Sequence, residues 1–164
     1  MTHRLVLISR WRLESSTAAV WNLLSKVETW PTWWRQVSRV EPGAANLLDF
    51  VAELHWWSAL PYGAGVRFAI DSSAAPRRLE FHALGGLPGF GAWLLEPAED
   101  GWIDVTYRWE ALLERRWMRA LSVLLRPLCE WHHFKLMRAT ADGMGRELDC
   151  RAQHLNEWSG TRWL

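Results

Sequence analysis

The sequence has few cysteines and no long apolar run. Its two cysteines, Cys129 and Cys150, form no CxxC pair, so we expect reduced thiols, with a single bridge between them as the alternative. The longest mostly apolar stretches, 87–95 and 120–125, are far shorter than the roughly 20 residues that cross a bilayer, so no transmembrane segment is predicted. The apolar run Leu5–Ile8 is too short for the core of a signal peptide. The sequence therefore predicts a cytoplasmic protein.

Neither sign of charge is in excess. The chain has 19 basic and 18 acidic residues, and no basic run interleaved with glycine or aromatic residues, which argues against a nucleic-acid partner. The GxSxG, HExxH, P-loop and GxGxxG motifs are absent as well. Their absence argues against the hydrolase, kinase and dehydrogenase classes, and we predict neither a metal site nor another cofactor.

Tryptophan, by contrast, is abundant. The chain has 14 tryptophans, and 49% of its 164 residues are apolar, which is enough for the core of one domain over 1–164. So many tryptophans either fill a core, because each buries a large area, or line a cavity for an apolar or aromatic ligand. Composition alone favours the filled core.

The spacing of the apolar residues predicts an α+β chain. Period-2 alternation over 3–14 indicates a first strand, and helical spacing then predicts a short helix that ends near Lys26. Pro31 suits the first turn of a second short helix. Alternation resumes between 37 and 110, broken by turn clusters, with the clearest strands over 50–56, 66–71, 78–83, 90–96 and 102–110. In 90–96 both faces are apolar, so the pattern does not distinguish an inward face.

The last third of the chain predicts one long amphipathic helix over 115–149. Pro127 lies inside it and removes a helical hydrogen bond, so we expect a kink or a break there. Residues 115–151 hold eight basic and four acidic side chains. This excess is interpreted as a solvated helix face; the alternative is that it steers the protein into transient contact with anionic membranes or with an acidic carrier partner.

This order of elements resembles the helix-grip fold of the START and Bet v 1-like (SRPBCC) superfamily, in particular its polyketide cyclase/dehydrase and lipid-transport branch. The residues that carry the resemblance are Ala19–Leu24, Trp30–Trp34, Val37, Val40, Glu41, Gly101, Val105–Glu110, Leu125–Leu128 and His132. The resemblance implies a curved antiparallel sheet of about seven strands wrapped around the C-terminal helix, with a deep apolar cavity between them. Because the superfamily includes carriers, cyclases and regulators, the fold does not determine the function.

Inward-facing residues of the strands and the long helix are the candidate ligand contacts. They are Trp34, Phe50, Leu54, Trp56, Phe68, Phe81, Tyr107, Trp109, Leu128, His132 and Leu136. Each could also pack on the others without enclosing a ligand. Trp34 and its neighbour Trp33 are expected to border the entrance of the cavity.

His132 is the polar residue expected to reach the interior, because it shares the apolar stripe of the helix with Leu128 and Leu136. His133 should point about 100° away from it. A buried, hydrogen-bonded histidine is one interpretation of His132; a general base acting with Tyr107 on the facing strand is the other. Arg67 and His82 fall on outward faces, and a shift of one residue would turn either into the pocket.

The resemblance and the residue patterns together imply three alternative functions. The first is a carrier or binding protein that encloses a hydrophobic small molecule, such as a lipid, a polyketide or an aromatic metabolite. The second is a metal-free cyclase or dehydratase of polyketide-like substrates that uses His132 and Tyr107. The third is an interaction module whose cavity is filled by tryptophans.

Overall fold

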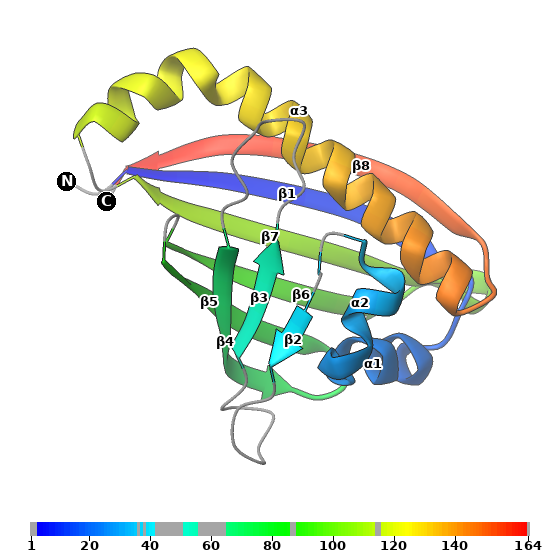
Figure 1. The fold of residues 1–164 in the computed structure, drawn as a ribbon. Helices are drawn as coiled ribbons and strands as arrows, with labels where there is room; N and C mark the ends of the chain where they lie inside the picture. The colour runs from blue at the N-terminus through cyan, green and yellow to red at the C-terminus, as the bar shows by residue number, and fades with distance from the viewer. Residues whose placement is uncertain are drawn as a thin grey trace.

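The computed structural model describes residues 3–35, 37, 39–41, 51–55, 65–85, 88–113 and 116–163 (Figure 1). Two short 3-10 turns, Val27–Thr29 and Glu99–Gly101, accompany the main elements. In chain order these elements are β1 (His3–Leu13), α1 (Thr17–Ser25), α2 (Trp30–Trp33), β2 (Arg39–Glu41), β3 (Val51–His55), β4 (Gly65–Ala74), β5 (Arg78–Gly85), β6 (Gly89–Pro97), β7 (Ile103–Leu113), α3 (Arg116–Glu147) and β8 (Ala152–Trp163).

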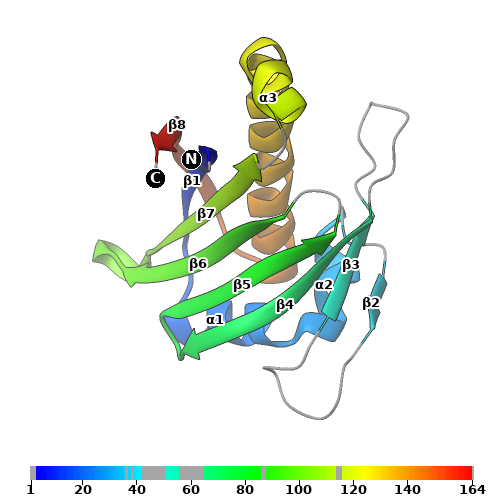
Figure 2. The ribbon, with the colours of Figure 1, turned by 90° about the vertical axis from the view of Figure 1, so that its left-hand side faces the viewer.

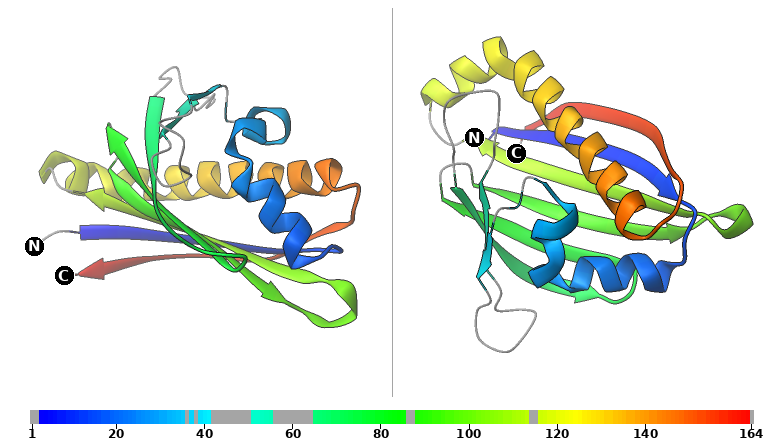
Figure 3. Two further views of the ribbon diagram at one scale, coloured as in Figure 1. Left: turned by 90° about the horizontal axis from the view of Figure 1, so that it is seen from below. Right: turned by 45° about the vertical axis from the view of Figure 1, so that its right-hand side comes forward.

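The strands form one antiparallel sheet in the order β2-β3-β4-β5-β6-β7-β1-β8. The sheet is curved, and all three helices lie on the same face of it (Figure 2, Figure 3). The long helix α3 packs against β7, β1 and β8, whereas α1 contacts β6 and α2 contacts α3. The core of the protein therefore lies between one face of the sheet and the helices.

Strands β1 and β7 have the alternation that the sequence predicts. Their inward residues are all buried, and they are Leu5, Leu7, Trp11, Leu13, Ile103, Val105, Tyr107 and Trp109. On the outer face, Arg4 donates a hydrogen bond to Glu110 at 3.0 Å, and Arg12 donates one to Asp104 at 3.1 Å. One side of the central strands thus faces the core, and the other carries ion pairs between strands.

The expectation of about seven strands is wrong, because β8 adds an eighth after the long helix. It pairs with β1 along its whole length, with a bulge opposite Arg10 and Trp11. Its apolar residues Leu155 and Trp158 are 37% and 50% exposed. An edge strand is held mainly by backbone hydrogen bonds to one neighbour, so it needs no clean apolar alternation. This segment therefore gave no strand signal in the sequence.

The long helix α3 runs without a break from Arg116 to Glu147, with Pro127 inside it. Of the two outcomes expected at Pro127, a kink or a break, the break is therefore wrong, whereas the axis of the helix does curve in its N-terminal half (Figure 1). Nearer its C-terminal end, α3 packs closely on α2. A Cβ atom on Gly143 would lie 2.2 Å from the Trp33 carbonyl oxygen, so only glycine allows this approach.

Two further predictions concern the cysteines and the membrane. Both cysteines are free thiols, Cys129 exposed and Cys150 partly buried, which confirms that interpretation. Within the described parts of the chain, no helix combines the length and the apolar character needed to span a bilayer.

Candidate functional site

A cluster of buried aromatic side chains lies between the sheet and α3, with Trp93 of β6 at its centre. The Trp93 ring centroid lies 5.8 Å from that of Trp11, 5.5 Å from that of Trp34 and 4.8 Å from that of Tyr107. All three contacts are edge-on, which is a preferred geometry for aromatic pairs. The cluster thus joins β1, the end of α2, β6 and β7 into one apolar surface.

Tyr107 of β7 and His133 of α3 face each other in this cluster. Their rings stack at 5.8 Å with an interplanar angle of 27°, and only 4% and 3% of the two residues are exposed. Burial, with a smaller contribution from the charge of His132, lowers the pKa of His133 to about 3. Burial also raises the pKa of the Tyr107 phenol. Both groups are therefore neutral at pH 7.

Several polar atoms of this interior have no hydrogen-bond partner among the described residues. They are the indole nitrogens of Trp11, Trp33, Trp34 and Trp93, Nε2 of His133 and Oγ of Ser9. Each unpaired buried donor or acceptor costs about 1–3 kcal/mol, and native interiors hold few of them. An indole N–H can only donate, so these four indoles present donors to the interior.

No protein-family model matches the chain, and neither does any curated protein. Solved structures do match it along most of its length. The Zhui aromatase/cyclase from a Streptomyces species is 12% identical, with a TM-score of 0.72 over 89% of this chain and 94% of that one. A START superfamily protein from Mycobacterium smegmatis is 9% identical, with a TM-score of 0.66 over 88% and 97%. A point mutant of norcoclaurine synthase from Thalictrum flavum, in complex with a transition-state analogue, is 10% identical, with a TM-score of 0.69 over 90% and 96%.

The chain has the helix-grip fold of the START and Bet v 1-like superfamily. This confirms the helix-grip fold that the resemblance implied. At such low identities the likeness establishes the fold, and the site must be argued from the residues of this chain.

Four of the predicted ligand contacts lie in the interior of the helix-grip fold. Trp34, Phe81, Tyr107 and Trp109 are each 4% exposed. Phe81 stacks on Tyr107 at 6.2 Å and on Trp109 at 6.4 Å. The structure therefore places these side chains together. At least one of Trp33 and Trp34 was expected to be exposed at the cavity entrance, but they are only 3% and 4% exposed, so this expectation is wrong.

The other predicted contacts from the strands stay untested. Phe50 and Trp56 lie outside the described residues. Leu54 and Phe68 lie on β3 and β4, where only the course of the backbone is described, and the same holds for Arg67. His82 is partly buried on β5, between the buried Phe81 and Ala83.

The prediction for α3 chose the wrong face. Leu128 is 41% exposed, and His132 and Leu136 are only partly buried. The buried face instead carries His133, Met137, Thr140, Ala141 and Met144. The buried face contains small residues and has Gly143 beside it, so the helix can pack closely there. The stripe at Leu128, His132 and Leu136 therefore does not face the core. His133, and not His132, is therefore the histidine inside the fold.

Trp93 and Trp11 were missed as site residues, although one signal for Trp93 was present. A Cβ atom on Gly91 would lie 2.2 Å from the Phe81 ring, so Gly91 faces the core and leaves room for that ring. A glycine inside a strand often marks such a close approach. If Gly91 is taken as an inward position of the strand, the alternation along 90–96 places Trp93 on the same inward face. Among the described side chains, no group of three or more candidate metal ligands occurs.

Two neighbouring tryptophans offer a test of the unpaired indoles. Trp30 Nε1 donates to the Leu24 carbonyl at 3.0 Å, whereas Trp34 Nε1 has no partner among the described residues. Both side chains are buried, and Trp30→Phe and Trp34→Phe each replace an indole by a phenyl ring. We expect Trp30→Phe to lower the unfolding free energy by about 1 kcal/mol more than Trp34→Phe, because only Trp30 loses a hydrogen bond. Urea unfolding of both variants measures the difference, and an equal or reversed order would show that Trp34 is already hydrogen-bonded.

Proposed function

We propose that this protein binds a hydrophobic small molecule between the sheet and α3, as a carrier or binding protein. The observation that carries the proposal is the set of unpaired donors within the aromatic cluster. A filled apolar core gains nothing from unpaired indole N–H groups, whereas a ligand with an oxygen acceptor would satisfy them. Binding sites for small molecules commonly combine such apolar walls with a few placed polar groups.

The contact between Tyr107 and His133 favours binding over proton transfer. A general base or acid works best when its pKa lies near the working pH. The imidazole of His133 has its pKa lowered to about 3, and the phenol of Tyr107 has its pKa raised. Both side chains are suited to hold a ligand by ring contact and hydrogen bonding. His132, predicted as a candidate base, lies outside the buried face of α3.

A cyclase-type enzyme is the second candidate, since a tyrosine facing a histidine in an apolar interior can also orient an enolisable substrate. The two candidates differ in what Tyr107→Phe does. For a carrier, affinity changes by about 0.5 to 1.5 kcal/mol, the contribution of one hydrogen bond. For an enzyme that uses Tyr107 in proton transfer, turnover of a polyketone falls by about 10²- to 10⁴-fold while affinity is kept.

The binding proposal is tested by organic extraction of the purified protein with mass spectrometry, followed by titration with the neutral dye Nile red. We expect an apolar compound in the extract, or saturable binding of one dye molecule that Tyr107→Phe weakens. The matched control is Phe90→Ser, which removes an apolar residue that is 45% exposed on the outer face of the sheet. An empty extract without saturable binding, or binding that only Phe90→Ser weakens, would contradict the proposal and favour the filled core.

A further inference from the structure

A second feature lies at the edge of the sheet, where β8 and β1 meet α3. A cleft of about 380 Å³ opens there, lined by Ser9, Arg10, Trp11, Met137, Arg138, His154, Leu155, Asn156 and Glu157. Its volume falls in the range of small-molecule sites. The additional strand β8 forms one of its walls, so the cleft depends on the element that the sequence did not predict.

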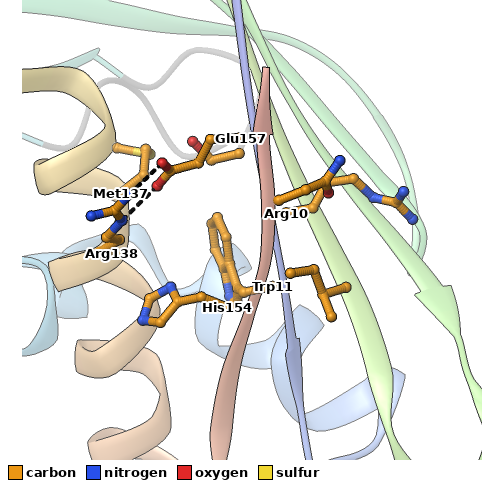
Figure 4. Close-up of a pocket in the computed structure, with 9 residues that line it drawn as sticks. Arg10, Trp11, Met137, Arg138, His154 and Glu157 are labelled. Carbon is orange, nitrogen blue, oxygen red and sulfur yellow. Dashed lines mark hydrogen bonds and ion pairs between the residues drawn. The ribbon is translucent and has the colours of Figure 1, made fainter. Parts of the chain in front are cut away.

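The floor of this cleft holds two buried groups that can donate hydrogen bonds. Ser9 and Trp11 of β1 are 2% and 1% exposed, and in the described part of the chain neither Ser9 Oγ nor Trp11 Nε1 has a partner. Figure 4 shows the Trp11 ring extending from the strands toward α3, beside Met137. The cleft thus combines an indole face and a thioether with two unused donors.

Arg10 lines the cleft but its side chain points away from α3 (Figure 4), where Nη2 lies 3.8 Å from Asp104 and Nε has no partner among the described residues. The titratable side chains on the α3 and β8 walls are paired. Arg138 of α3 donates to Glu157 of β8 through two hydrogen bonds, of 2.8 and 2.5 Å (Figure 4). His154 Nε2 lies 3.2 Å from an oxygen of Asp142. An anionic ligand would have to compete with Glu157 for Arg138, whereas a neutral one leaves these pairs intact.

We propose that the cleft between β8 and α3 is a binding site for a neutral, largely apolar molecule with a carbonyl oxygen. The Ser9 hydroxyl and the Trp11 indole N–H are covered in the free protein, so in this proposal the lining side chains move apart on binding. The carbonyl then accepts hydrogen bonds from these two donors, and the apolar part lies against the Trp11 ring and Met137. Neither Tyr107 nor His133 lines the cleft. The interior site proposed above uses the unpaired indoles of Trp34 and Trp93, whereas the cleft uses the donors of Ser9 and Trp11.

The experiment uses two probes that differ in one oxygen, 2-acetylnaphthalene and 2-ethylnaphthalene. Methyl-labelled methionine reports the position of binding by NMR, since Met137 lines the cleft while Met144, two turns further along α3, is fully buried and does not. We expect the ketone to shift the Met137 methyl signal saturably and to leave that of Met144 unchanged. We also expect it to bind about 3- to 10-fold more tightly than the hydrocarbon, as one net hydrogen bond allows.

Two variants test the donors, and a third serves as the control. Ser9→Ala and Trp11→Phe should each reduce the preference for the ketone. Thr140→Val should leave it unchanged, because the Thr140 hydroxyl is buried on the same helix but already donates to the Leu136 carbonyl at 2.9 Å. If the Ser9→Ala protein does not fold, the preference of the Trp11→Phe protein for the ketone alone tests the proposal.

Three outcomes would overturn the proposal. The first is an unmoved Met137 signal, and the second is an equal preference for the ketone in the wild type and in both donor variants. The third is tighter binding of 2-naphthoate than of the ketone, which would show an anion site. A shift of the Trp34 indole signal without a shift at Met137 would place the ketone in the interior, which rejects the cleft and supports the function proposed above.

Discussion

Acidification from pH 7 to about pH 3 will lower the unfolding free energy by about 4 to 5 kcal/mol through His133 alone. The pKa of His133 is lowered from an ordinary value of 6.5 to about 3, because the residue is buried against Tyr107. Between these two values the unfolded chain binds a proton at this histidine and the folded chain does not. The contribution of His133 to the unfolding free energy is therefore fully present above pH 6.5. It falls by about 1.4 kcal/mol per pH unit as the pH drops, and the fall levels off near pH 3.

The adjacent histidine provides the control for this effect. His133→Phe keeps an aromatic ring against Tyr107 but cannot titrate, so its stability should fall less steeply than that of the wild type between pH 6 and pH 4. His132→Phe should keep most of the wild-type slope, because His132 is only partly buried. Urea unfolding at a series of pH values measures the slopes.

Carboxylates such as Glu110, whose pKa is lowered by Arg4 and Arg108 against the effect of burial, contribute equally to all three proteins. Equal slopes for His133→Phe and the wild type would show that His133 is accessible to protons in the folded state.

Trp93→Ala will lower the unfolding free energy by about 3 to 5 kcal/mol, the range for removing a buried aromatic side chain. Trp93 is 0% exposed, and it contacts Trp11, Trp34 and Tyr107 from three different directions. Since single domains are stable by only about 5 to 15 kcal/mol, this loss should be visible as a large decrease in melting temperature.

Trp131→Ala is the matched control for Trp93. Trp131 is 54% exposed on α3, and its ring is covered only by Lys135 Nζ at 4.9 Å among the described contacts. Its removal should cost about 1 kcal/mol or less. Thermal and urea unfolding of both variants gives the comparison. Similar losses for the two tryptophans would contradict the central position of Trp93 in the core.

The local elements of the fold could be predicted because their patterns are strict. In β1 and β7 apolar and charged residues alternate, so each strand has only one face that can be buried. Tyr107 and Trp109 were placed inside the fold for this reason, and Phe81 followed from the same pattern in β5. The start of α1 is also set locally, because the Ser16 hydroxyl accepts a hydrogen bond from the Ala19 N–H at 3.1 Å.

The face of α3 could not be predicted in the same way. The helix offers two stripes one residue apart, one through His132 and one through His133, and both contain apolar side chains. The choice depends on how closely α2 and the sheet approach, which the sequence of the helix does not contain. The face with Thr140, Ala141 and Gly143 allows the closer approach, and this turns His133 inward.

The sequence by itself determined the order of the elements up to α3 and the inward faces of β1, β5 and β7, because periodicity acts over a few residues. The helix-grip architecture followed from the resemblance of that order of elements to a known superfamily. Only the tertiary structure decided that β8 pairs with β1, that His133 meets Tyr107, and that the indoles of Trp11, Trp34 and Trp93 are buried without partners among the described residues. These features join segments far apart in the chain. Their energies depend on which surfaces meet, and no local pattern encodes that.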